Sequence, residues 1–306
     1  MNESRIAEIL EAFEVYDGSY RRAHVSAALA RQEEITPHLI AVLEGVLAKP
    51  SVYVGKEDYF AHLYAFILLG HFREQAAHRV IVDLFSLPPN IPDQLFAELV
   101  SESLPIVLFR TCHGELGLIK SLALNRQADE YSRGSALRAM TFAVADGMIA
   151  REEVLAFFGS LFTGEEAASN STFWDQLAYC VYDLYPEELM DVIEQAYEDG
   201  LIAPGFISYK EFLQSLEGGK ERALRRMQAK MQRNSLDNVH KYMSWWACFK
   251  ENKQVRASVP QMSEVVPSIA SSRKKARKKD AAPKSRHQAK RKKKGKKAGS
   301  KKKKRR

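Results

Sequence analysis

The feature that most constrains the fold is an apolar stripe of helical spacing that recurs along the chain at nearly constant intervals. Five segments carry apolar residues at positions i, i+3, i+4 and i+7, which one face of a helix buries. The stripes begin at Leu39, Ala77, Leu116, Val154 and Leu189, so the intervals are 38, 39, 38 and 35 residues. The third stripe is the weakest because Lys120 interrupts it. A nearly fixed period of this length is typical of stacked helical repeats.

A second apolar segment, opened by an aromatic residue, precedes most of the stripes. These segments span residues 20–30, 59–69, 131–144 and 173–184. Each pair of segments predicts a helical hairpin, and runs of alternating β-branched residues are nearly absent. A period in the high thirties is nearest to that of HEAT and armadillo repeats, roughly 40 to 47 residues. We therefore expect an all-α fold, a HEAT-like α-solenoid of about five helical hairpins, with a non-repeating helical bundle as the alternative.

The repeat pattern fades after residue 204. Ser208 and Glu211 form a capping-box pattern, which predicts the start of a helix. A basic helix over residues 220–233 and an amphipathic segment over 236–249 follow, and we expect them to cover the last hydrophobic face of the repeats. The predicted divisions are a helical-repeat domain, a C-terminal helical cap, a linker and a disordered Lys/Arg-rich tail, over residues 1–204, 205–253, 254–272 and 273–306.

The charge of the chain is divided unevenly. Residues 273–306 contain 21 Lys or Arg and one Asp, whereas residues 1–272 contain 25 Lys or Arg and 37 Asp or Glu. So many cations repel one another and bury nothing, which predicts a disordered tail with a polyanion partner. The tail has no aromatic side chain to stack on bases, so we expect it to bind RNA or DNA without reading sequence. The predicted phosphate contacts are Lys274, Lys275, Arg277, Lys278, Lys279, Lys290, Arg291, Lys292, Lys293, Lys294, Lys296, Lys297, Lys301, Lys302, Lys303, Lys304, Arg305 and Arg306.

Two features of the body predict a surface that binds another protein. The segment over residues 186–200 carries six acidic residues and no basic one, which indicates either a docking strip for a cationic partner or a solvated face. Two adjacent tryptophans cannot both face one core, so we expect one against the last repeat and the other near the surface. The predicted protein-binding residues are Glu187, Glu188, Asp191, Glu194, Trp245 and Trp246.

Signals for catalysis, metals and membranes are weak. The chain has no nucleophile elbow, phosphate-binding loop or dinucleotide fingerprint, and its three cysteines lack metal-ligand spacing. We therefore expect a non-enzymatic protein with no cofactor, no metal and no membrane span, while the oligomeric state stays open. The competing interpretation is an enzyme or metal-binding protein whose site forms across repeats around His62, His71, Cys112 and His113. His71 and His78, with His62 nearby, are a separate candidate for a metal site.

Five stretches of the body resemble a bacterial family catalogued as domain of unknown function 1186. The stretches are ARQEEITPHLIAVLEGVLAKP, HLYAFILLGHFREQAAHRVIVDLFS, GLIKSLALNRQADEYSRGSALRAM, DLYPEELMDVIEQAYEDGLI and MSWWACF, at residues 30–50, 62–86, 117–140, 183–202 and 243–249. The resemblance implies a HEAT-like helical fold in a bacterial protein and supplies no catalytic residue. Some relatives end in a small Cys/His zinc motif, whereas this chain has the basic tail, so the resemblance gives no metal role.

These observations together predict a scaffold that binds a protein through its repeats and RNA or DNA through its tail. We expect it in the cytoplasm, with the ribosome or the nucleoid as places where the tail would find nucleic acid. The tail motifs KKARKK and KRKKKGKK are also similar to nuclear-import signals. They define a third hypothesis, a host-directed effector that enters the nucleus of a eukaryotic cell.

Overall fold

The computed structural model describes residues 2–249, and within that range the fold is all-α, as predicted. The described residues form no strand; Val15 and Tyr59 make one isolated bridge. The predicted linker 254–272 and tail 273–306 lie outside the described residues. The α-helices are α1 (Asn2–Glu14), α2 (Arg22–Leu29), α3 (Gln32–Ala48), α4 (Pro50–Tyr53), α5 (Ala61–Phe72), α6 (His78–Phe85), α7 (Ile91–Phe96), α8 (Leu99–Glu102), α9 (Leu104–Thr111), α10 (Gly117–Leu124), α11 (Glu130–Ala145), α12 (Arg151–Leu161), α13 (Thr172–Asp183), α14 (Met190–Glu198), α15 (Tyr209–Gly218), α16 (Lys220–Arg233) and α17 (Val239–Met243). Two short 3-10 helices, η1 (Gln75–Ala77) and η2 (Glu187–Leu189), precede α6 and α14.

The apolar stripes of the sequence form buried helix faces. The five stripes lie in α3, α6, α10, α12 and α14, the last together with η2. In α3, for example, Leu39, Leu43 and Val46 are fully buried. The aromatic-led segments that precede the stripes become α2, α5, α11 and α13. The prediction of helices from periodicity is therefore confirmed over most of residues 20–200.

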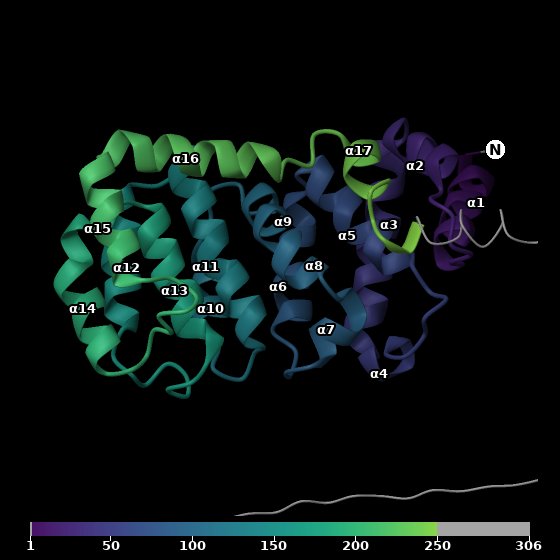
Figure 1. Cartoon of the computed structure of the whole chain (residues 1–306). Helices are drawn as coiled ribbons and strands as arrows, with labels where there is room; N and C mark the ends of the chain where they lie inside the picture. The colour runs from purple at the N-terminus through teal and green to yellow at the C-terminus, as the bar shows by residue number, and fades with distance from the viewer. Residues whose placement is uncertain (1, 250–306) are drawn as a thin grey trace, which may run out of the picture. The chain divides into compact units, whose positions relative to one another are not determined.

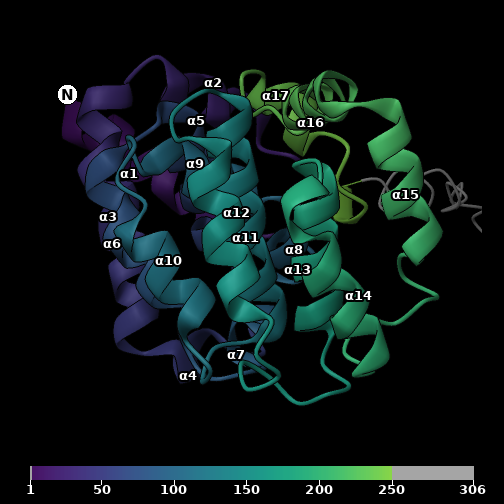
Figure 2. The ribbon, with the colours of Figure 1, turned by 90° about the vertical axis from the view of Figure 1, so that its left-hand side faces the viewer.

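The helices of residues 2–249 stand side by side in a row (Figure 1). Along the row α3 contacts α5, α5 contacts α9, α9 contacts α11, and α11 contacts α13. The helices α6, α10 and α12 lie beside them. Figure 2 looks along the row from its α14 end and shows α6 and α10 to the left of α11. The central helices are buried on nearly all sides; every residue of α9 is buried. One continuous hydrophobic core therefore runs through the row.

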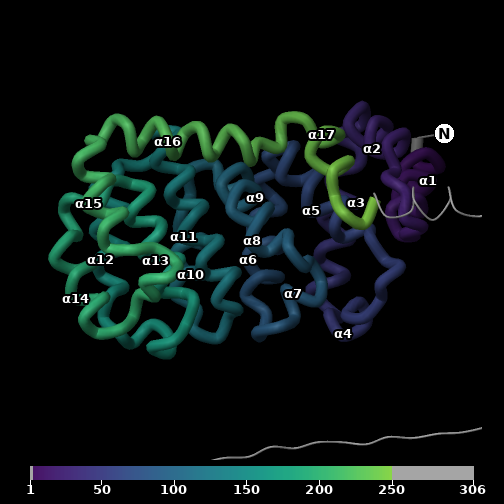
Figure 3. The backbone as a smooth tube through the Cα atoms, in the orientation of Figure 1, coloured from purple at the N-terminus to yellow at the C-terminus, as the bar shows by residue number. Residues whose placement is uncertain are grey.

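The segment that was expected to cap the last hydrophobic face does so only in part. Only its first helix, α15, contacts α14. Then α16 runs along the row across the ends of its helices, where it contacts α11 and α13, and α17 contacts α5 (Figure 3). We call residues 219–249 the return segment. The predicted helix over 236–249 is also shorter, because α17 spans only Val239–Met243.

The return segment lies at the N-terminal helices because its apolar residues find partners there. A close contact forms at Gly70 of α5, where an added Cβ atom would lie 3.0 Å from Leu236 and 2.7 Å from Val107. Further along, the Phe249 ring lies among Tyr16, Tyr20, Phe60 and Tyr64, with ring centroids 5.5–6.5 Å apart. The Tyr16 hydroxyl donates a hydrogen bond to the Cys248 carbonyl, and the Tyr20 hydroxyl shares one with His240 Nδ1. Both bonds support this packing.

Arginine side chains donate hydrogen bonds to the carbonyls at the C-terminal ends of four helices. The last carbonyls of a helix lack intrahelical donors, and a guanidinium can donate to two of them at once. Arg21 donates to carbonyls at the end of α1, Arg110 to the end of α5, Arg133 to the end of α10 and Arg151 to the end of α13. The last three side chains are buried. Arg110 and Arg151 link helices that are more than 30 residues apart in the sequence.

Candidate functional site

The predicted acidic strip lies on η2 and α14, at the far end of the row from α1. Residues 151–217 contain two Lys or Arg and 14 Asp or Glu, which makes this end the most acidic part of the body. Glu187, Asp191 and Glu194 are exposed there. Burial and then the nearby carboxylates of Glu194 and Asp191 raise the pKa of Tyr209 on α15. The strip is therefore a negatively charged surface with an aromatic hydroxyl beside it.

Glu188 has a different role from its neighbours. Both of its carboxylate oxygens accept hydrogen bonds from the Arg151 guanidinium, at 2.6 Å each. This hydrogen bonding holds the pKa of Glu188 below its usual value. Arg151 also caps α13, so Glu188 is part of a structural ion pair between α12 and η2. The surface available for docking at this end is carried by Glu187, Asp191 and Glu194.

The two tryptophans face opposite environments, as adjacent residues should. Trp245 is 66% exposed, whereas Trp246 is half-buried and its ring stacks on Phe249 at 5.8 Å. The prediction placed the inner tryptophan against the last repeat, and this part is wrong. Trp246 belongs to the aromatic cluster with Tyr16, Tyr20 and the first hairpins, because the return segment brings it there.

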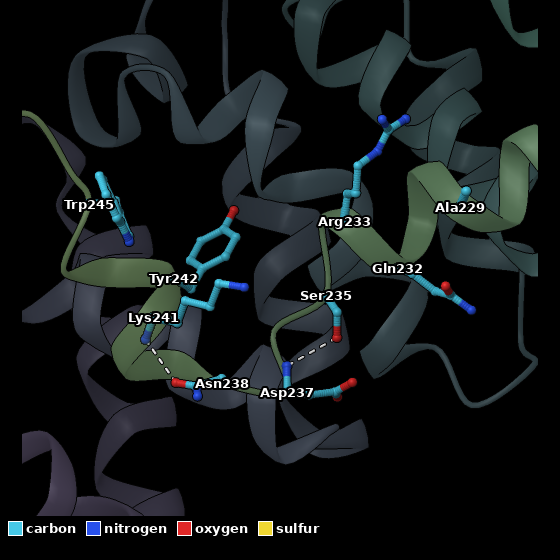
Figure 4. A pocket seen from close by; sticks show the side chains of 9 residues that line it. All are labelled: Ala229, Gln232, Arg233, Ser235, Asp237, Asn238, Lys241, Tyr242 and Trp245. Atoms are coloured by element: carbon cyan, nitrogen blue, oxygen red, sulfur yellow. Dashed lines mark hydrogen bonds between the residues drawn. The ribbon is translucent and has the colours of Figure 1, made fainter.

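A groove between α16 and α17 is a candidate binding site on the described residues. It encloses about 750 Å³ and opens beside Trp245. Figure 4 shows side chains of α16 on one side and those of α17 with Trp245 on the other. Its lining residues are Ala229, Gln232, Arg233, Ser235, Asp237, Asn238, Lys241, Tyr242 and Trp245.

The sequence indicated two parts of this groove but did not indicate that they face each other. The basic helix over 220–233 and the exposed tryptophan were both visible, but the turn at residues 234–238 that sets them face to face was not. Contacts with residues far away in the sequence fix that turn and α17. The Tyr242 hydroxyl and Ser103 Oγ share a hydrogen bond of 2.6 Å, and Arg110 Nη1 donates to Asp237 Oδ1 at 2.6 Å. The groove is therefore held against α8, α9 and the turn between them.

Three histidines proposed for a metal or catalytic site are each hydrogen-bonded to a main-chain carbonyl. His62 Nε2 donates to the Leu95 carbonyl, His71 Nδ1 to Leu236, and His113 Nε2 to Arg73, at 2.6–2.7 Å. Burial lowers the pKa of His62 to about 4, so its imidazole is neutral near pH 7. In residues 2–249 no group of three or more His, Cys, Asp or Glu side chains is placed to hold a metal ion.

The other two candidate residues, His78 and Cys112, also have hydrogen-bond partners in the protein. His78 Nδ1 lies 2.8 Å from Thr111 Oγ1, and Cys112 Sγ donates to the Phe109 carbonyl. Burial raises the pKa of the Cys112 thiol, which disfavours a thiolate nucleophile or ligand. The described side chains of the hypothesis therefore tie neighbouring helices together rather than meeting around one point.

Other predicted features fall outside the structure's range. All 18 predicted phosphate contacts of the tail, Lys274 to Arg306, lie outside the described residues. Across residues 2–249, no helix has the length and apolar content that a membrane span needs.

Comparisons with known proteins identify relatives but no activity. The sequence profile of a family described as protein of unknown function (DUF1186) matches residues 4–250. An uncharacterized protein of Chlamydia trachomatis serovar D is 31% identical over 206 residues, which cover 67% of this chain and 82% of that protein. An uncharacterized protein of Chlamydia muridarum matches with the same identity and coverage. No solved structure matches the chain significantly. The match over nearly the whole body, along the stretches quoted from the sequence, means that this chain belongs to the DUF1186 family of proteins of unknown function.

Proposed function

We propose that this protein is a non-enzymatic scaffold that joins a cationic protein partner to nucleic acid. The helical row acts as a HEAT-like body whose acidic end receives the protein partner. The basic tail tethers the body to RNA or DNA without sequence specificity. This assignment places the protein in the cytoplasm, where both kinds of partner occur.

The separation of charge along the chain carries the proposal. Residues 151–217 hold 14 acidic and two basic residues, whereas residues 273–306 hold 21 basic and one acidic residue. A surface of one sign attracts partners of the opposite sign and repels those of its own sign, so the two parts cannot favour the same partner. Separate partners for the two parts follow from this division.

The HEAT-like assignment is supported by the order of contacts. Each of α5, α9, α11 and α13 contacts the next, and each is followed or preceded by an amphipathic helix on the flank of the row. Repeats that contact only their neighbours leave long surfaces free for binding, which is the usual role of such arrays. Function in this proposal resides in surfaces rather than in a catalytic pocket.

The tether is tested by measuring nucleic-acid affinity against salt concentration. The test variant replaces residues 301–306, KKKKRR, with six Gln; the matched control reorders the same residues to RRKKKK. If all six cations contact phosphates of a single strand, the slope of log K against log salt falls by about 4 in the test variant. The control should bind as the wild type does, because charge and not order matters. Equal slopes for the wild type and the Gln variant would contradict the tether.

The acidic strip is tested with a Lys-rich peptide as the probe. The variant Glu187→Gln, Asp191→Asn, Glu194→Gln should bind the peptide more weakly at low salt. A matched control removes three exposed acidic residues outside this end, Glu11, Glu44 and Glu57, by Gln substitution. Equal losses in the two triple variants would show that only net charge matters, and the docking strip would be rejected.

A further inference from the structure

We propose that the groove between α16 and α17 binds single-stranded nucleic acid, with a base stacked on Trp245 and phosphates held by Arg233 and Lys241. This inference rests on the proposed nucleic-acid function and extends it from the tail to the folded body. The tail would then deliver a strand to a site that distinguishes single strands from duplexes.

The first support is a change in the sign of charge along the body. Residues 1–217 contain 15 Lys or Arg and 33 Asp or Glu. Residues 218–249 contain seven Lys or Arg and two Asp or Glu. The basic residues of α16 are arranged by its amphipathic pattern: Ala223 and Met227 are buried, while Arg222, Arg225 and Arg233 are exposed. The return segment is therefore a cationic strip laid across an otherwise acidic body, and charge complementarity favours a polyanion there.

The second support is the pairing of cations with an aromatic surface. Trp245 is 66% exposed at the edge of the groove, and aromatic faces stack on nucleic-acid bases whatever their identity. Within residues 2–249 neither Arg233 nor Lys241 forms a side-chain ion pair, so both are available for phosphates. The tail has cations but no aromatic residue, so this combination is a property of the groove.

The acidic residue in the groove does not oppose this assignment. Asp237 is the acidic member of the lining, and its carboxylate accepts a hydrogen bond from the buried Arg110 guanidinium at 2.6 Å. The positive charge of Arg110 therefore compensates the negative charge of Asp237. The amides of Gln232 and Asn238 add neutral groups that can both donate to and accept from a base or sugar.

The size and rigidity of the groove favour a flexible strand over a duplex. Its volume of about 750 Å³ lies in the range, roughly 300 to 1,000 Å³, of pockets that hold drug-sized ligands such as a nucleotide. The faces of bases inside a duplex are covered by the neighbouring base pairs, so these bases cannot stack on Trp245. The site is anchored to Ser103 through Tyr242 and to α5 through the close contact at Gly70, so binding requires little ordering of the protein.

The test uses the full-length protein with three labelled probes: a 12-nucleotide oligouridylate, an oligothymidylate of equal length, and a 12-base-pair duplex. Trp245→Ala should weaken binding of both single strands by about 5- to 100-fold per the usual value of one stacked base. Duplex affinity and the salt slope should not change, because stacking releases no counterions. The matched control is Phe206→Ala, which removes an aromatic side chain of similar exposure, 54%, at the acidic end.

The cations are tested separately. Arg233→Gln with Lys241→Gln should lower the single-strand salt slope by about 1.4, since each phosphate contact contributes about 0.7. The matched control, Arg79→Gln with Lys49→Gln, removes an exposed Arg and an exposed Lys outside the return segment and should leave the slope unchanged. Single strands should also quench tryptophan fluorescence in the wild type more than in Trp245→Ala, which retains Trp174 and Trp246.

Different results overturn the two proposals. If Trp245→Ala and the Arg233/Lys241 variant bind single strands as the wild type does, the groove is not the site, whatever the tail does. Equal wild-type affinity for single strand and duplex would also overturn the groove. If instead the groove variants lose binding and the Gln-substituted tail does not, the groove stands and the tether of the proposed function fails.

Discussion

Replacement of Arg151 should destabilise the body more than replacement of any exposed arginine. The Arg151 side chain is 4% exposed and donates to the Leu184 and Tyr185 carbonyls at the end of α13, while it pairs with Glu188. In Arg151→Ala the two carbonyls lose their donors, and each buried unsatisfied polar group costs about 1–3 kcal/mol. Glu188 is 47% exposed, so water can take over its solvation, and loss of the ion pair adds less than about 1 kcal/mol. We expect a total loss of about 2–5 kcal/mol in the free energy of unfolding.

The assay is urea unfolding followed by circular dichroism of the helices. For a body of this size, a loss of 1 kcal/mol also lowers Tm by about 2–4 °C, so thermal unfolding gives a second reading. Arg79→Ala is the matched control, because Arg79 is 71% exposed and pairs with Asp83 on the same helix, which is worth less than about 0.5 kcal/mol. Arg151→Lys should lose most of the same stability, because an ammonium cannot donate in the fork geometry that the two carbonyls need. Equal unfolding midpoints for Arg151→Ala and Arg79→Ala would refute the assigned role.

Three further substitutions test the packing, the buried histidine and the helix cap. Gly70→Ala should cost about 1–3 kcal/mol, because its Cβ would lie 2.7 Å from a side chain of α9; Gly117→Ala, with no atom within 4 Å, should cost nothing measurable by urea unfolding. The pKa of His62 is lowered to about 4, so the unfolded chain binds more protons below pH 6.5 and stability falls as pH drops toward 4. From pH 7 to pH 5 this loss is about 2 kcal/mol, and His62→Gln should show a correspondingly shallower pH dependence; an unchanged dependence would contradict the assignment. Ser208→Ala removes the capping box of α15 and should cost about 1 kcal/mol, whereas Ser208→Thr, which keeps the hydroxyl that donates to Glu211, should retain most of that stability.

Periodicity predicted the helices that bury one face and missed the helix that buries all of its faces. The stripes of α3, α6, α12 and α14 alternate with polar residues, so their buried sides can be read from spacing. Every residue of α9 is buried, and its sequence LPIVLFRT has no polar side to mark a period. No helix was therefore predicted before the Leu116 stripe, where α7, α8 and α9 lie.

The sequence could not tell where the return segment lies, because an amphipathic pattern identifies a buried face without identifying its partner. Ala223 and Met227 would form the same stripe on a terminal cap and on a helix that crosses the row. The same limit applies to Glu188 in the candidate docking strip. It was indistinguishable from Glu187 in the sequence, and only the burial of Arg151, 37 residues away, separates them. Contacts at such a distance depend on the assembled fold.

The placement of Phe249 has a consequence for the order in which the chain can reach its native state. Tyr16 and Tyr20 are synthesised early in translation, whereas Phe249, whose ring packs against theirs, is added more than 220 residues later. Closing so long a loop is slow compared with pairing neighbouring helices. An N-terminal aromatic surface therefore stays open to solvent, and to other proteins, throughout most of translation. A nascent chain that stops before residue 249 would keep this surface exposed.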